Sequence, residues 1–268
     1  MIAALSIGLI ILIGGIDLSI GSILILTGVI TANVINLTDN TVLSILVALV
    51  FSTILGLING AAIGILKLNF VIVTLATMQA YRSLADVISN KSPIRISNEN
   101  FNYLGSGYIE VGNIYELPIV IFPIISVYFL FSYLLDKNIF FRKVKLIGSN
   151  TNTAKISGIN VKLNTMWTYA LSGSLIGLAT VIDTGRVMSV HPMSGLNLEF
   201  DAITAVIIGG ASLKGGVLSI SSTFLGVLIV GCIVSGLSLM NIQAFYVKVL
   251  KGFILLVAII LNQILEKK

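Results

Sequence analysis

Long apolar segments make up most of this chain, and short glycine-rich or polar segments separate them. A helix needs about 20 residues to cross the hydrocarbon core of a bilayer. The pattern predicts spans or half-spans over residues 2–14, 20–36, 41–60, 68–89, 117–135, 163–182, 202–210, 217–239 and 245–263. We therefore expect an all-α, polytopic transmembrane helical bundle with about seven full crossings plus discontinuous or re-entrant helices.

The first interruption is the sequence GGIDLSIGS, which begins at Gly14. Gly14 and Gly15 can adopt backbone angles that end a helix, and a break at membrane depth is tolerated only inside protein or beside a wet cavity. Asp17 is an ionisable group in apolar sequence, which indicates a functional site by default. Asp17 and Ser19 can bind substrate hydroxyls, or they can cap the next helix without touching substrate. Both interpretations stay open.

The second interruption follows the apolar segment 202–210, which is too short to cross a bilayer. Two acids precede it, and glycines and a serine follow it. The helix dipole favours acids near a helix N-terminus, so Glu199 and Asp201 have a structural alternative to a pathway role. Two broken helices, one in each half of a chain, indicate a substrate route between them. The candidate pathway residues are Asp17, Ser19, Glu199, Asp201, Gly209, Gly210 and Ser212.

Composition supports a membrane protein with one domain. Hydrophobic residues make up 56% of the 268 residues and charged residues only 10%, which leaves too little polar surface for a water-soluble domain. We therefore expect a single transmembrane domain over residues 1–268. The one cysteine, Cys232, excludes an internal disulfide and is expected to be a small packing residue.

Charge predicts which segments face the cytoplasm. The segment of about 136–162 carries six basic residues against the single acid Asp136, so the positive-inside rule places it in the cytoplasm. The segment of about 91–116 has more acids than bases and is expected outside. The ending 266–268, with two lysines, is expected in the cytoplasm. Lys248 and Lys251 then fall near the outer end of the last helix, where they can snorkel to the interface or line the pathway.

Catalytic motifs are missing from the sequence. It has no Gly-x-x-x-x-Gly-Lys-Ser/Thr loop for nucleotide phosphates, so any ATP hydrolysis must occur in a partner. It also has no HExxH or GxSxG motif and no ligand cluster with metal spacing. We therefore expect neither an enzyme nor a metal site, and an inert scaffold would have no need of two broken helices.

Four motifs carry a resemblance to a known family. They are GGIDLSIGSILILTG (14–28), IVTLATM (72–78), GSNTNTAKISGINV (148–161) and LEFDAITAVIIGGASLKGG (198–216). On these motifs the chain resembles the inner-membrane permease subunits of ATP-binding cassette (ABC) importers for ribose and related monosaccharides. The resemblance implies two permease subunits, two cytoplasmic ATP-binding subunits and an extracytoplasmic sugar-binding protein. It implies no cofactor bound by this chain, with ATP used by the partner subunit, and no nucleic-acid partner.

In similar permeases the segment corresponding to 148–161 holds a short coupling helix that docks on the ATPase. The residues agree with a helix there, because Asn150 or Thr151 can cap it and Gly158 suits its end. The predicted coupling residues are Gly148, Asn150, Ala154, Ser157, Gly158 and Ile159. Family members carry an additional N-terminal helix, which this chain is expected to lack.

Three questions stay open, which are the energy source, the substrate and the second permease. Broken helices equally suit a transporter of a small polar solute that is driven by an ion gradient, for which Asp17 offers the one plausible relay residue. The substrate can be ribose, galactose, another pentose or hexose, a nucleoside or a sugar-like signal molecule. The permease can pair with a second copy of itself or with a related permease.

Overall fold

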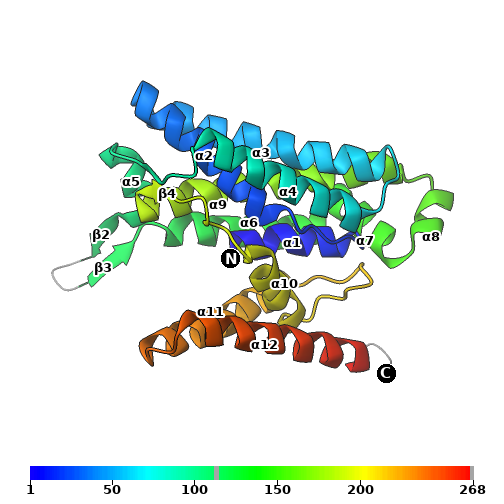
Figure 1. The fold of residues 1–268 in the computed structure, drawn as a ribbon. Helices are drawn as coiled ribbons and strands as arrows, with labels where there is room; N and C mark the ends of the chain where they lie inside the picture. Colours follow the sequence, from blue (N-terminus) through cyan, green and yellow to red (C-terminus); the bar gives the residue numbers. More distant parts are fainter. Residues whose placement is uncertain (112–114, 266–268) are drawn as a thin grey trace.

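A computed structural model describes residues 1–111 and 115–265 of the protein. It is almost entirely helical (Figure 1). The helices are α1 (Ile2–Leu12), α2 (Ile20–Thr38), α3 (Thr41–Gly64), α4 (Phe70–Ile88), α5 (Glu99–Ser106), α6 (Ile121–Lys137), α7 (Ile139–Ser149), α8 (Thr151–Ile156), α9 (Val161–Val187), α10 (Leu198–Ile208), α11 (Ile220–Leu239) and α12 (Ala244–Leu265). The strands are β1 (Ile94–Arg95), β2 (Tyr108–Val111), β3 (Tyr115–Pro118) and β4 (Ser189–Val190).

The number of full crossings is smaller than the sequence pattern predicted. Among the described residues, α2, α3, α9, α11 and α12 are long and apolar enough to cross a membrane. The pair α6 and α7, bent by 71°, raises the total to six if it counts as one span. The expectation of about seven crossings is therefore wrong. Helix α4 has 19 residues but carries Gln79, Arg82 and Asp86, and α6 alone is only 17 residues long.

Asparagine side chains start many of the helices. Each accepts hydrogen bonds from backbone N–H groups in the first turn, which satisfies donors that have no partner within the helix. The capping residues are Asn40 of α3, Asn69 of α4, Asn98 of α5, Asn138 of α7, Asn150 of α8 and Asn160 of α9. Each of these helices therefore begins at a residue that the local sequence supplies, independently of packing between helices.

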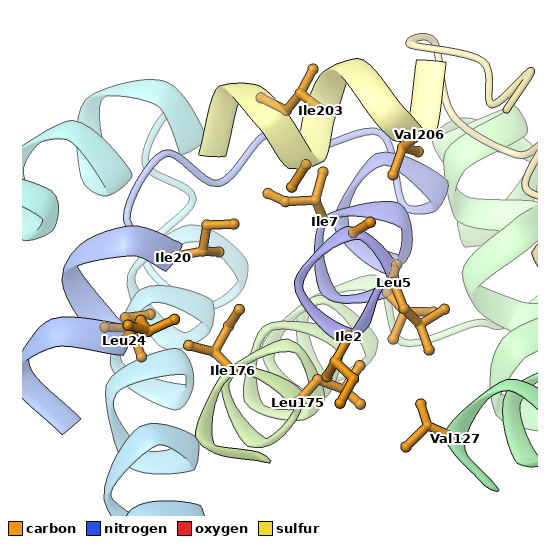
Figure 2. Close-up of a cluster of buried hydrophobic side chains, with 14 of the residues drawn as sticks. Ile2, Leu5, Ile7, Ile20, Leu24, Val127, Leu175, Ile176, Ile203 and Val206 are labelled. Atoms are coloured by element: carbon orange, nitrogen blue, oxygen red, sulfur yellow. The ribbon is translucent and has the colours of Figure 1, made fainter. Parts of the chain in front are cut away.

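Helices α1 and α2 form the centre of the bundle. Helix α1 is only 11 residues long and is buried along nearly its whole length, as expected for a helix that is apolar on every side. Figure 2 shows α1 between the side chains Leu175 and Ile176 of α9 and the side chains Ile203 and Val206 of α10. Most of the predicted apolar segment 2–14 thus forms a short, buried helix at the centre of the bundle.

The two polar segments lie at opposite ends of the bundle (Figure 1). The segment 91–116 is a small cap made of β1, α5 and the β2–β3 hairpin, and β1 pairs antiparallel with β4. The segment 136–162 lies at the other end and is not a plain loop. It contains α7 and α8, and α7 buries Phe141, Val144 and Ile147 against the bundle. The predicted cytoplasmic ending 266–268 lies outside the described residues.

Helices α3 and α9 pack backbone to backbone. The α3–α9 seam consists of Ser52, Gly56, Gly60 and Gly64 on α3 with Gly173 and Gly177 on α9. A Cβ atom added to Gly56 would lie 3.0 Å from the Cα atom of Gly173, and one added to Gly60 would lie 2.6 Å from the carbonyl oxygen of Met166. Small residues at every fourth position allow this close approach between membrane helices. The seam brings the backbones of the two long helices into close contact.

Replacing Gly56 with leucine is expected to force α3 and α9 apart. Overpacking of this kind lowers the free energy of unfolding by about 1–3 kcal/mol or more. The midpoint of thermal unfolding of the purified protein in detergent measures the effect. The matched control is Gly236→Leu on α11, because no heavy atom lies within 4 Å of a Cβ added there. Equal midpoints for the two variants would contradict close packing at the seam.

Candidate substrate pathway and coupling region

The break between α1 and α2 is closed by local hydrogen bonds. Gly14 has a φ of +84°, which suits glycine, and its amide donates to the carbonyl oxygen of Ile11 at 2.9 Å. Asp17 Oδ1 accepts from the Ser19 amide at 2.8 Å and from Ser19 Oγ at 2.5 Å. Asn59 of α3 donates to Ser19 Oγ at 2.8 Å. These bonds fix the turn that precedes α2, but the N-cap residue Ser19 makes no side-chain cap hydrogen bond. Contact with substrate stays a prediction.

Asp17 and Ser19 are enclosed by protein, with exposed fractions of 1% and 0%. Glu199 of α10 lies near them and is 6% exposed. A Cβ added to Gly21, in the first turn of α2, would lie 2.8 Å from Glu199 Oε2. Three of the predicted pathway residues therefore gather where α2 begins, in the middle of the bundle.

The second break lies beyond α10, whose 11 residues span only about 16 Å. Gly209 packs closely on α11, because a Cβ added there would lie 2.7 Å from the carbonyl oxygen of Ser222. Gly210 has a φ of +79°, and the Ser212 amide donates to the carbonyl oxygen of Val217 at 3.3 Å. Since Glu199 and Asp201 are at the other end of α10, the predicted pathway residues form two separate groups.

The two breaks meet each other and the end of α7. The Gly216 amide donates to the carbonyl oxygen of Leu12, the last residue of α1, at 2.9 Å. A Cβ added to Gly148 of α7 would lie 2.6 Å from the Gly216 nitrogen, and one added to Gly215 would lie 3.0 Å from the Gly14 Cα atom. We call this meeting point the glycine junction (Gly14, Gly148, Gly215, Gly216). Gly148 therefore lies at the breaks rather than on an exposed coupling loop.

An ion pair joins α10 to α12. Lys251 Nζ lies 2.7 Å from Asp201 Oδ2, and both side chains are about one-third exposed. Lys251 was expected either to snorkel to the interface or to line the pathway. Its ammonium group pairs with Asp201, which is a predicted pathway residue. Asp201 also lines a cavity of about 420 Å³ that reaches Asp183 and Arg186 at the end of α9. Asp183 pairs with Arg186 at 3.5 Å.

The remaining predicted coupling residues build a short exposed helix. Asn150 caps α8 by accepting from the amides of Asn152 and Thr153, both at 3.0 Å. Ala154 is buried and anchors α8, whereas the Ile156 side chain is 89% exposed. The helix ends at Ser157, and Gly158 follows with a φ of +76°. The half-buried Ile159 donates from its amide to the carbonyl oxygen of Ala154 at 3.0 Å.

Broken helices at the centre of an apolar bundle are a feature of membrane transporters. A family model described as the permease component of branched-chain amino acid transport systems matches residues 1–259. The chain belongs to this permease family. It is therefore a membrane permease rather than an enzyme, and its apolar helices make it a multi-pass protein of the cytoplasmic (inner) membrane.

Relatives of this permease cover nearly its whole length. An L-arabinose transport system permease protein of Escherichia coli is 35% identical over 254 residues, which are 95% of this chain and 76% of the relative. A ribose import permease protein of Bacillus subtilis is 37% identical over 256 residues, or 95% and 78%. The ribose import permease protein of Haemophilus influenzae is 35% identical over 268 residues, or 100% and 82%. No solved structure matches the chain significantly.

Replacing Gly148 with valine is expected to open the glycine junction, because the added side chain would displace the Gly216 amide from the Leu12 carbonyl. Hydrogen–deuterium exchange should rise in residues 13–19 and 212–216, and the unfolding midpoint should fall. The control is Gly231→Val, where a Cβ meets no heavy atom within 4 Å. Unchanged exchange at both breaks would refute the junction.

Replacing Lys251 with methionine is expected to leave the Asp201 carboxylate without its cation. The loss of a hydrogen bond between charged groups lowers the free energy of unfolding by about 1.5–3 kcal/mol. Adding Asp201→Asn removes the unpaired charge, so the double variant should recover part of the stability. Thermal unfolding of both variants tests this, and additive losses in the double variant would argue against a pair.

Proposed function

We propose that this permease is the membrane-spanning subunit of an ABC importer for a monosaccharide of the ribose or arabinose type. The observation that carries the proposal is the set of relatives named as ribose and L-arabinose permeases, each 35–37% identical over at least 95% of this chain. The family description itself names branched-chain amino acid transport. We favour a sugar because relatives that match almost the entire chain are named for sugars.

In this proposal α8 is the contact to an ATP-binding subunit. Its Ile156 side chain is 89% exposed at the end of the bundle opposite the β2–β3 cap (Figure 1), and its neighbour Lys155 is exposed too. An isolated apolar side chain beside a cation, on a helix anchored by the buried Ala154, suits insertion into a groove on a partner protein. ATP is hydrolysed by that partner, and this chain binds no cofactor.

Movement of α8 would reach the pathway through the glycine junction. Helix α8 follows directly after α7, and Gly148 lies in the last turn of α7 against Leu12 and Gly216. Backbone contacts at this distance leave little room for one part to move without the others. A shift of α8 on ATP binding would therefore displace the two broken helices together and change access to the pathway.

The other partners follow from the same proposal. A second permease, either a second copy or a related chain, completes the pathway, and an extracytoplasmic sugar-binding protein delivers the substrate to the end that carries α5 and the β2–β3 hairpin. Polar groups of the pathway are the predicted residues near the start of α2, which are Asp17, Ser19 and Glu199, together with Asp201 in the first turn of α10.

Proteoliposomes that contain the permease and its ATP-binding subunit should take up D-ribose or L-arabinose only when ATP and binding protein are supplied. Ile156→Asp should reduce uptake about tenfold or more and should weaken copurification of the ATP-binding subunit, because a charge replaces the docked apolar side chain. Ile156→Leu keeps the apolar side chain and is the matched control.

Uptake that needs no ATP and collapses with a protonophore would instead support the ion-gradient alternative. Normal uptake and copurification in the Ile156→Asp variant would remove α8 as the docking helix while leaving ATP-driven import in place.

A further inference from the structure

A cavity of about 650 Å³ lies at the end of the bundle that carries α8 (Figure 1). Its walls come from the end of α3 and the turn after it, from α8, and from the start of α9. Of the described residues, three lysines line it, Lys67, Lys155 and Lys162, and no acidic side chain does. Its volume is within the range of small-molecule sites. The cavity can therefore hold a ligand, and its charged groups are all positive.

The three ammonium groups have no anionic partner within residues 1–111 and 115–265, where none of them forms an ion pair or a side-chain hydrogen bond. By contrast, Lys145 and Lys251 each pair with an aspartate. Like charges around one hollow repel each other, and an anion between them relieves the repulsion. Lysine is a compact point charge that binds phosphate groups. The cavity therefore suits a phosphate-bearing anion.

Local backbone structure holds two of these lysines on facing walls. Lys67 has a φ of +58°, and the next amide, of Leu68, donates to the carbonyl oxygen of Ala62 at 3.2 Å. Lys162 lies in the first turn of α9. A Cβ atom added to Gly64 would lie 2.5 Å from the Lys162 carbonyl oxygen, so the end of α3 touches the start of α9. The α3–α9 seam thus fixes the separation of the two lysine backbones.

Neighbouring side chains place the cavity at the level of lipid headgroups. Trp167 of α9 is the one tryptophan of the chain and is 54% exposed. Tryptophan on membrane helices gathers at the membrane–water interface. Lys162 precedes it by five residues, or about 7.5 Å along the helix, toward the end of the bundle. Leu66 and Leu68, on either side of Lys67, are both exposed. A basic hollow beside exposed apolar side chains suits a ligand with both a phosphate and acyl chains.

We infer that this cavity binds the headgroup phosphate of an anionic phospholipid such as phosphatidylglycerol, through Lys67, Lys155 and Lys162. The acyl chains would lie on the exposed apolar side chains of the turn after α3. Basic pockets between membrane helices bind anionic headgroups in this way. The inference goes beyond the proposed function, because it assigns a lipid site and holds for any transported substrate. A headgroup bound there would bridge α8 to α3 and α9, so the lipid would hold α8 in place.

Photochemical labelling by lipid tests the site directly. The permease is placed in phosphatidylcholine nanodiscs, alone and with its ATP-binding subunit, together with a small share of a probe lipid. The probe is phosphatidylglycerol or phosphatidylcholine with a diazirine near the glycerol end of one acyl chain. Mass spectrometry identifies labelled peptides after digestion with pepsin, which does not need lysine for cleavage. Peptides that cover 63–69 and 159–167 should carry about threefold or more label from phosphatidylglycerol than from phosphatidylcholine.

The double variant Lys67→Gln, Lys162→Gln should lose most of this preference. The concentration of the phosphatidylglycerol probe for half-maximal labelling should rise about tenfold or more, since each lysine near an anionic lipid contributes roughly fivefold in affinity. The matched control is Lys137→Gln, Lys143→Gln, which removes the same charge. These two lysines are exposed at the same end of the bundle and do not line the cavity. The control should keep the preference of the unaltered protein.

Equal labelling by the two probes in the unaltered protein would overturn the inference, whether or not the variants fold. An equal loss in both double variants would also overturn it, because it would indicate general attraction of anionic lipid to a basic surface. Inorganic phosphate should not reduce the labelling relative to chloride at the same ionic strength, and displacement would assign the cavity to free phosphate instead. A preference that disappears when the ATP-binding subunit is added would assign the cavity to the contact with that subunit.

Discussion

The hydrogen bond from the Gly216 amide to the Leu12 carbonyl, 2.9 Å long, joins the two places where helices break inside the bundle. A broken helix exposes backbone donors and acceptors that lipid cannot satisfy, so such breaks survive only where protein supplies the partners. Here each break supplies a partner for the other. Glycines surround this bond because side chains at Gly148 or Gly215 would occupy the space that the backbones share.

This constraint also explains why the two ends of the bundle differ. At the end with α7 and α8, the breaks and α7 approach each other closely through backbone atoms. At the end with α5, an ion pair between Asp201 and Lys251 joins α10 to α12, and a cavity lies between α9 and α10. The fold thus combines a tightly connected end at α7 and α8 with a hollow end at α5, joined by the short helices α1 and α10.

Much of this architecture could be predicted from the chain. Apolar length and asparagine caps define most helix boundaries, and the short segments at both breaks are helices of 11 residues. Helix α7 was missed because its basic residues suggested a loop and hid the spacing of Phe141, Val144 and Ile147. The four-residue spacing of Gly56, Gly60 and Gly64 was visible in the sequence and would have indicated the seam. The contacts of Gly148 and the pairing of Lys251 with Asp201 join segments far apart in the chain, so no local pattern could reveal them.

The α3–α9 seam has a mechanical consequence. Where two helices touch through backbone and glycine, there are few rotamers to rearrange, so any relative sliding of the helices must break the contact outright. Helices α3 and α9 are therefore expected to move as one rigid body along the length of the bundle. Relative motion between helices would then fall to α10 and α12, which are joined through the side chains of Asp201 and Lys251.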